Sequence, residues 1–150
     1  MKNRLHSLDT SVIRTCRKIE VPLLRFALFL VYAWFGLLKV WDLSPATPLV
    51  LELLDRTMPF MSPDAFLIGF GFFEVVLGIL FLFPRFTRMA FFLLTIHLVT
   101  TMLPLIILPH MVWTRLFVPT LEGQYIIKNI LIIAIAVSLA AREKPLRVEA

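Results

Sequence analysis

The chain has 150 residues, of which 59% are hydrophobic and 17% charged, and its mean hydropathy is +0.88. A soluble domain carries about 45–50% apolar and about 25% charged residues, so this composition excludes a small soluble enzyme and a disordered chain. The formal net charge is +5, which by itself would suggest nucleic acid as a partner. Because Cys16 is the single cysteine, the chain can form neither an internal disulfide nor a CxxC redox pair.

Four apolar segments of about 18–20 residues predict transmembrane helices, because that length gives roughly 27–30 Å of helix and matches the hydrocarbon core. They cover residues 22–41, 64–83, 89–108 and 124–141. Buried helices of a soluble bundle would have polar faces, which these segments lack. The expected fold class is therefore an all-α membrane protein: one domain over residues 1–150, built as a four-transmembrane-helix bundle.

The basic residues predict the orientation of this bundle. Ten of them flank the segments on one side, and two lie on the other. By the positive-inside rule both termini, including the tail 142–150, are expected in the cytoplasm. The positive charge then signals topology, and nucleic acid is not an expected partner. The ten are Lys2, Arg4, Arg14, Arg17, Lys18, Arg85, Arg88, Arg142, Lys144 and Arg147, and the two are Arg56 and Arg115.

Short amphipathic segments are expected at both membrane surfaces. In residues 1–21, the apolar residues recur at three- or four-residue spacing among basic ones, which predicts a helix lying on the inner leaflet. These apolar residues are Leu5, Leu8, Val12, Cys16 and Ile19. On the opposite side, Thr47 is expected to cap a short helix that begins at Pro48. The loop 109–124 is expected to lie at the interface as well.

Charged or titratable side chains inside a span are costly, so each one needs a reason. Arg25 is close enough to the cytoplasmic edge to reach the headgroups, and it is expected to serve as an anchor. Glu74 and His97 fall near the midplane, and Lys39 and Lys128 fall in the outer third. We therefore expect a charge-compensated cluster in which both lysines lie within salt-bridging reach of Glu74.

Helical spacing places the polar residues of all four spans on faces that would converge on one interior. Small residues on the face of Glu74 would let a neighbouring helix approach closely, so Glu74 should point inward. Two interpretations stay open: the cluster only fixes the packing of the helices, or it also binds or moves something. The residues of this polar core are Tyr32, Lys39, Glu74, His97, Gln124 and Lys128, with Gly36, Gly71 and Gly78 at the packing positions.

Several chemistries find no support in the sequence. A haem held by two histidines lacks a second histidine within the spans, and a Cys/His metal site has too few ligands. The chain has no P-loop and no GxGxxG followed by a helix, so it contains no self-contained catalytic motif.

Three short motifs resemble the DoxX superfamily, in particular its bacterial inner-membrane branch that includes a reactive-chlorine resistance protein. They are WFGLLK at Trp34–Lys39, FEVVLG at Phe73–Gly78 and EGQYIIKN at Glu122–Asn129, and the resemblance covers about residues 22–141. It implies a four-helix inner-membrane protein linked to quinone-dependent oxidoreductases and to redox or thiol stress. It also implies that Gly36, Lys39, Glu74, Gly78 and Lys128 are the polar core positions.

Two functions follow as expectations. The first is a membrane subunit that binds a quinone and associates with redox proteins, with Lys39, His97, Lys128 and Tyr32 supplying polar groups beside many Phe rings. The second is a small transporter or channel in which Glu74 responds to protons or cations. A purely structural membrane anchor is the remaining alternative. The bilayer itself and a second copy of the chain complete the expected partners.

Overall fold

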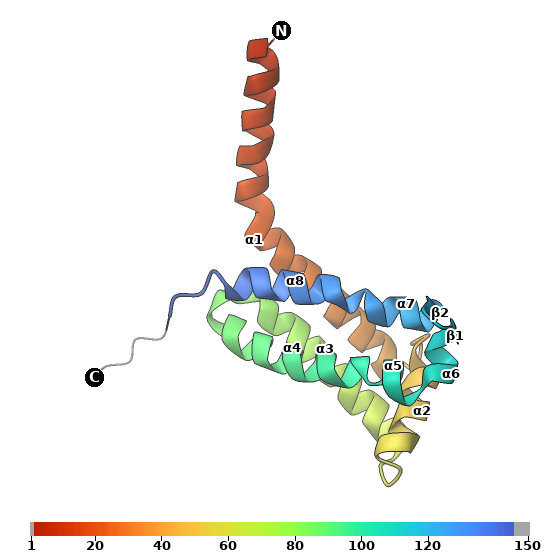
Figure 1. The fold of residues 1–150 in the computed structure, drawn as a ribbon. Helices are drawn as coiled ribbons and strands as arrows, with labels where there is room; N and C mark the ends of the chain where they lie inside the picture. The colour runs from red at the N-terminus through yellow and green to blue at the C-terminus, as the bar shows by residue number, and fades with distance from the viewer. Residues whose placement is uncertain (1, 146–150) are drawn as a thin grey trace.

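The computed structural model describes residues 2–145, with side chains from residue 6 onward, and most of that length is helical (Figure 1). Four of the described stretches are long and apolar enough to cross a membrane: His6–Val40, Pro63–Leu82, Pro84–Ile107 and Leu121–Ala140. This is the architecture of a multi-pass membrane protein. The elements in chain order are α1 (Lys2–Val40), α2 (Thr47–Thr57), α3 (Pro63–Leu82), the 3₁₀ turn η1 (Pro84–Phe86), α4 (Thr87–Met102), α5 (Pro104–Ile107), α6 (Pro109–Val112), β1 (Trp113–Arg115), β2 (Val118–Pro119), α7 (Leu121–Ile127) and α8 (Asn129–Ala140).

The tightest helix contact joins α1 and α3, and glycines make it. A Cβ placed on Gly36 would lie 2.5 Å from the carbonyl oxygen of Gly71, and one on Gly71 would lie 2.6 Å from the carbonyl oxygen of Gly36. A Cβ on Gly78 would meet the backbone of Ala33 at 2.9 Å. The two backbones therefore touch directly along this line, as small residues permit at helix interfaces in membranes.

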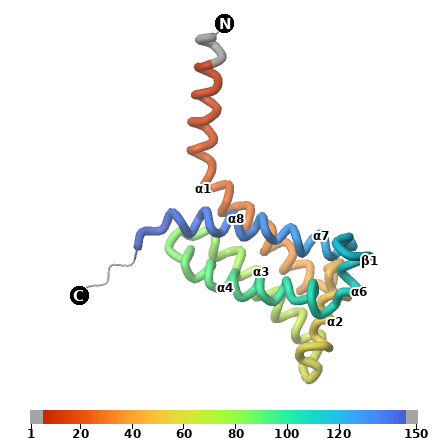
Figure 2. The backbone as a smooth tube through the Cα atoms, in the orientation of Figure 1, coloured from red at the N-terminus to blue at the C-terminus, as the bar shows by residue number. Residues whose placement is uncertain are grey.

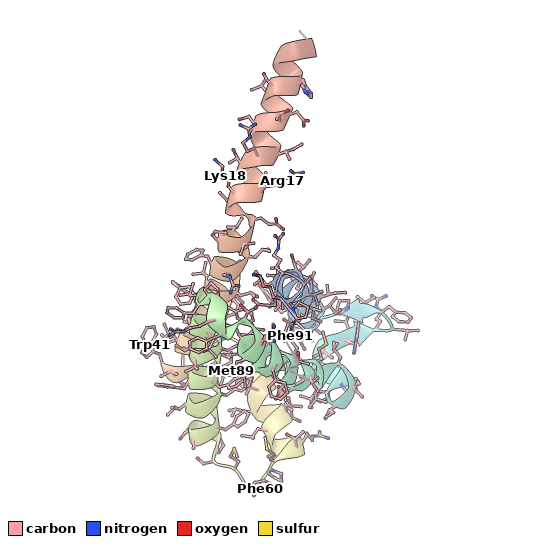
Figure 3. All side chains as sticks on the ribbon, turned by 90° about the vertical axis from the view of Figure 1, so that its left-hand side faces the viewer. Arg17, Lys18, Trp41, Phe60, Met89 and Phe91 are labelled. Atoms are coloured by element: carbon pink, nitrogen blue, oxygen red, sulfur yellow. The ribbon has the colours of Figure 1, made fainter. Side chains whose placement is uncertain are left out.

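The helices α4 and α8 complete the interior. Leu28 of α1, Leu77 and Phe81 of α3, Leu94 of α4 and Leu139 of α8 form one buried cluster, and none of these side chains is more than 1% exposed. The outward-facing side chains are also largely apolar, and most of the sticks around the helices in Figure 3 are carbon. Among the labelled ones, Trp41, Phe60 and Met89 are exposed. Apolar side chains on both the interior and the exterior are expected for helices that lie in the hydrocarbon of a bilayer, where exposed polar groups are costly.

The N-terminal part of α1 leaves the other helices and extends across their direction (Figures 1 and 2). It forms one unbroken helix with the first span, and its position on the inner leaflet stays a prediction. Pro22 lies inside α1, where it has no N–H to donate and its ring crowds the carbonyl of Lys18; this accounts for the change of direction. An ion pair of 2.5 Å between Glu20 and Arg142 joins α1 to the segment that follows α8.

The opposite end of the molecule is less regular than the sequence suggested. Thr47 is the first residue of α2 rather than its cap, and its buried Oγ1 has no hydrogen-bond partner among the described residues. The third span breaks at Leu103, because Pro104 cannot donate to the carbonyl of Thr100 and the N–H of Leu103 bonds there instead at 3.3 Å. The loop 109–124 forms a small antiparallel hairpin, β1–β2, which the sequence pattern did not predict.

Candidate functional site

Glu74 of α3 joins three helices through its two carboxylate oxygens. Its Oε2 accepts a hydrogen bond from Lys39 Nζ of α1 at 2.6 Å, and its Oε1 lies 3.0 Å from His97 Nε2 of α4. All three residues are buried, with exposed fractions of 7% or less. We call Lys39, Glu74 and His97 the buried triad. An ion pair this far from water depends on close geometry and full hydrogen bonding to offset its desolvation.

The close contact of α1 and α3 lets Lys39 reach the carboxylate. Gly71 lies one turn before Glu74, and a Cβ at that position would come within 3.0 Å of the Cβ of Lys39. Without a side chain at Gly71, the stem of Lys39 packs against the α3 backbone and its ammonium group extends to Glu74. The spacing of Gly71, Glu74 and Gly78 thus puts the carboxylate and the packing surface on the same face of α3.

Aromatic rings surround His97. The ring of Tyr32 meets it edge-on with centroids 5.2 Å apart, and Phe70 and Phe73 lie nearly parallel to it at 5.2 and 5.9 Å. Phe70 in turn stacks on Phe66 at 5.5 Å. The imidazole is therefore held in a fixed plane between apolar surfaces.

One polar atom of this cluster lacks a partner. His97 Nδ1 is buried and makes no hydrogen bond to any described residue. An ionised Glu74 can only accept, so the proton of a neutral His97 belongs on Nε2, where it is donated to Oε1. Nδ1 then holds a free lone pair, and a buried acceptor without a partner is costly unless a ligand or water meets it.

The charges of the buried triad cancel when the imidazole is neutral. The ammonium of Lys39 compensates the carboxylate of Glu74 at 2.6 Å, so the cluster carries no net charge into the apolar interior. Protonation of His97 would add one positive charge there. No group of three or more His, Cys, Asp or Glu side chains within residues 6–145 is arranged to hold a metal ion.

Lys128 and Gln124 do not join the triad, which corrects the sequence-based expectation. Both are exposed, and Lys128 Nζ lies 5.0 Å from the ring centroid of Tyr125 rather than near Glu74. The reason is local: α7 ends at Ile127 and α8 begins at Asn129, so Lys128 lies at a junction between helices. The helix face that carries Gln124 and Lys128 is therefore exposed instead of facing the interior. The second nitrogen partner of Glu74 is His97 instead of Lys128.

Phe70 and Phe73 were missed, although the sequence carries a signal for them. Phe70 precedes Glu74 by four residues and Phe73 precedes it by one, so Phe70 shares the face of the carboxylate. In a segment this rich in Phe, that signal does not stand out against lipid-facing rings.

Arg25 was expected to extend toward the membrane surface, and the structure turns it inward instead. Its guanidinium donates to the carbonyl oxygen of Phe81 at 3.1 Å and to Thr87 Oγ1 at 2.9 Å, and it lies 3.9 Å from Glu143. It therefore links α1 with the end of α3, the start of α4 and the segment after α8. Its role is to tie helix ends together.

Comparison with known proteins adds no relative: neither the family models, nor the curated proteins, nor the solved structures contain a match to this chain. The DoxX resemblance therefore depends on the three short motifs alone and stays a prediction.

Proposed function

We propose that this chain is a membrane subunit that binds the headgroup of a quinone-class molecule at His97, in a redox or redox-stress complex of a bacterial inner membrane. The single observation that carries the proposal is the buried, unpartnered Nδ1 of His97, within the part of the chain that the structure describes. Glu74 fixes the tautomer that leaves this atom as an acceptor.

The rings packed against His97 would suit such a headgroup. A quinol hydroxyl is a donor that would satisfy the free lone pair, and its aromatic ring and isoprenoid tail need apolar surroundings. Phe70, Phe73 and Tyr32 supply aromatic surface against the imidazole. Lys39 is held by Glu74, so its role is to compensate the charge of the carboxylate that orients the imidazole, not to contact the headgroup.

The proposal includes the four-helix bundle, cytoplasmic termini and redox protein partners. The DoxX resemblance implies the bundle and the redox partners, and the positive-inside rule gives the cytoplasmic termini. The ends of α3 and α8 and the start of α4 lie at one end of the molecule, where Arg25 contacts all three regions (Figure 1). The basic residues at this end are Arg85, Arg88, Arg142 and Lys144. The positive-inside rule assigns this end to the cytoplasm.

The second candidate function is a transporter that uses Glu74. The geometry of the buried triad favours a transporter that responds to protons over one that binds metal cations. Both carboxylate oxygens already have a nitrogen partner, Lys39 on one and His97 on the other, so a metal cation would have to displace an ammonium group. A proton needs no such displacement, because it can bind at Nδ1 of His97.

The test uses the purified protein in mild detergent, with thermal unfolding followed as decyl-ubiquinol is added. We expect stabilisation of the unmodified chain and its loss in His97→Gln, because glutamine can still donate to Glu74 but has no acceptor at the position of Nδ1. His110→Gln is the matched control, since His110 is exposed on α6. Equal stabilisation of all three proteins would overturn the proposal, and proton flux in vesicles that requires His97 would favour the second candidate.

A further inference from the structure

A cleft opens at the end of the molecule where α4 begins and α8 ends, away from the buried triad. Its volume is about 420 Å³. Thr87, Arg88 and Phe91 of α4 line one side, and Ala140 of α8 with Glu143 and Lys144 after it line the other. The wall is therefore polar and basic where the helices end and apolar where they continue along the span.

Cationic groups outnumber acidic ones at this cleft. Arg88 and Lys144 are both exposed, and Arg88 donates a hydrogen bond to the backbone carbonyl of Lys144, which brings the segment after α8 over the start of α4. Arg25 stands directly behind the lining, because it contacts Thr87 Oγ1 at 2.9 Å and lies 3.9 Å from Glu143. Two cations and one carboxylate thus line the cleft, and a third cation lies behind its wall.

Arg25 also has an unused donor. Its side chain is only 11% exposed, and its Nε is buried with no hydrogen-bond partner in residues 6–145. The separation of 3.9 Å from Glu143 is too long for a hydrogen bond, so the guanidinium is incompletely satisfied by the protein. An anion bound in the cleft would compensate the excess positive charge that Arg25 adds behind its wall.

We propose that this cleft binds the phosphate group of an anionic phospholipid. The cleft lies where the apolar helices end, which is the depth of the lipid headgroups, and basic pockets between transmembrane helices on the cytoplasmic side are suited to anionic headgroups. Phe91 and Ala140 continue the cleft toward the hydrocarbon, where the acyl chains of the lipid would pack. The site is separate from His97 and from quinone binding, and it takes only the cytoplasmic position of this end from the function proposed above.

The experiment measures thermal stabilisation of the purified full chain in detergent on addition of phosphatidylglycerol, phosphatidylcholine or inorganic phosphate. We expect phosphatidylglycerol to bind more tightly than phosphatidylcholine, and Arg88→Gln and Lys144→Gln to weaken its apparent affinity about fivefold each. Glu143→Gln should strengthen it, because the one opposing charge is removed. Arg85→Gln is the matched control: Arg85 precedes the cleft by one turn and lies over the rings of Phe83 and Phe86 instead.

The two sources of phosphate give different results. Stabilisation by phosphatidylglycerol but not by inorganic phosphate supports the lipid headgroup, whereas stabilisation by inorganic phosphate that requires Arg88 and Lys144 supports the same site with a soluble phosphate as its ligand. If Arg85→Gln lowers the affinity as much as Arg88→Gln, or if phosphatidylcholine stabilises as well as phosphatidylglycerol, the site proposal is wrong.

Discussion

Lys39 and Glu74 form an ion pair of 2.6 Å in which neither side chain is more than 7% exposed. A pair buried to this extent contributes little net stability compared with apolar residues of the same shape, but loss of one partner leaves the other charge uncompensated. His97 shares the carboxylate, so the pair also sets the orientation of the imidazole. Helix packing and the proposed binding site are therefore coupled at Glu74.

Replacement of Glu74 separates these roles. Glu74→Gln should lower the free energy of unfolding by about 3–5 kcal/mol, because the ammonium of Lys39 stays buried without a counter-charge. The double variant Glu74→Gln, Lys39→Met should recover much of that loss. Thermal unfolding in detergent measures both effects, and a double variant no more stable than Glu74→Gln would show that the ion pair is not the source of the loss.

The same double variant distinguishes a structural cluster from a binding site. If the cluster only packs the helices, the stable double variant should retain decyl-ubiquinol binding and cellular activity. If Glu74 orients His97, binding should fall although the protein folds, because the tautomer at Nδ1 is no longer fixed by a carboxylate.

The glycine contact between α1 and α3 gives a second prediction with an internal control. Gly36→Ala should destabilise the protein by about 1–3 kcal/mol, because its Cβ would lie 2.5 Å from the carbonyl oxygen of Gly71 and the helices must separate. Gly69→Ala should be neutral or slightly stabilising. Apart from its chain neighbours and the backbone of its own helix, no described atom lies within 4 Å of a Cβ at this position. Equal melting temperatures of the two variants would contradict this.

The contacts of Arg25 with the helix ends predict that its replacement lowers stability, and that a positive charge alone does not restore it. Arg25→Leu removes hydrogen bonds of 3.1 Å to Phe81 O and 2.9 Å to Thr87 Oγ1, and it should cost about 1.5–3 kcal/mol. Arg25→Lys should recover only part of this, because an ammonium group lacks the planar fork that reaches two acceptors at once. If lysine restored the full melting temperature, the role of Arg25 would be its charge.

The sequence was sufficient to predict the four candidate spans, because length and hydropathy depend on no long-range contact. It also predicted that Glu74 faces inward with Lys39 near it, because Gly71 and Gly78 mark the packing face of α3. Lys128 could not be placed, since the interruption between α7 and α8 is not encoded by a proline or glycine at that point. For Arg25, the inward position depends on the end of α3 and the start of α4, whose arrangement is a tertiary property.

The N-terminal part of α1 supports a last prediction, which uses the single cysteine of the chain. Leu8, Val12 and Ile19 are exposed in the structure, and Cys16, also exposed, lies near them on the same side of the helix by its spacing. This part of α1 runs across the direction of the spans (Figure 1). A basic helix with an unpartnered apolar face, held at such an angle, is suited to the surface of an anionic leaflet.

In vesicles, Cys16 should therefore react slowly with a water-soluble maleimide, because its thiol would lie among lipid headgroups. A cysteine introduced at Thr10, in a chain that carries Cys16→Ser, should react much faster, since Thr10 lies about 120° around the helix from Cys16. In detergent-free inside-out vesicles the Thr10 variant should label, and in right-side-out vesicles it should be protected, because the proposed topology puts the basic end in the cytoplasm. Equal labelling rates at the two positions would place this helix in water, and labelling only from the outer side would reverse the topology.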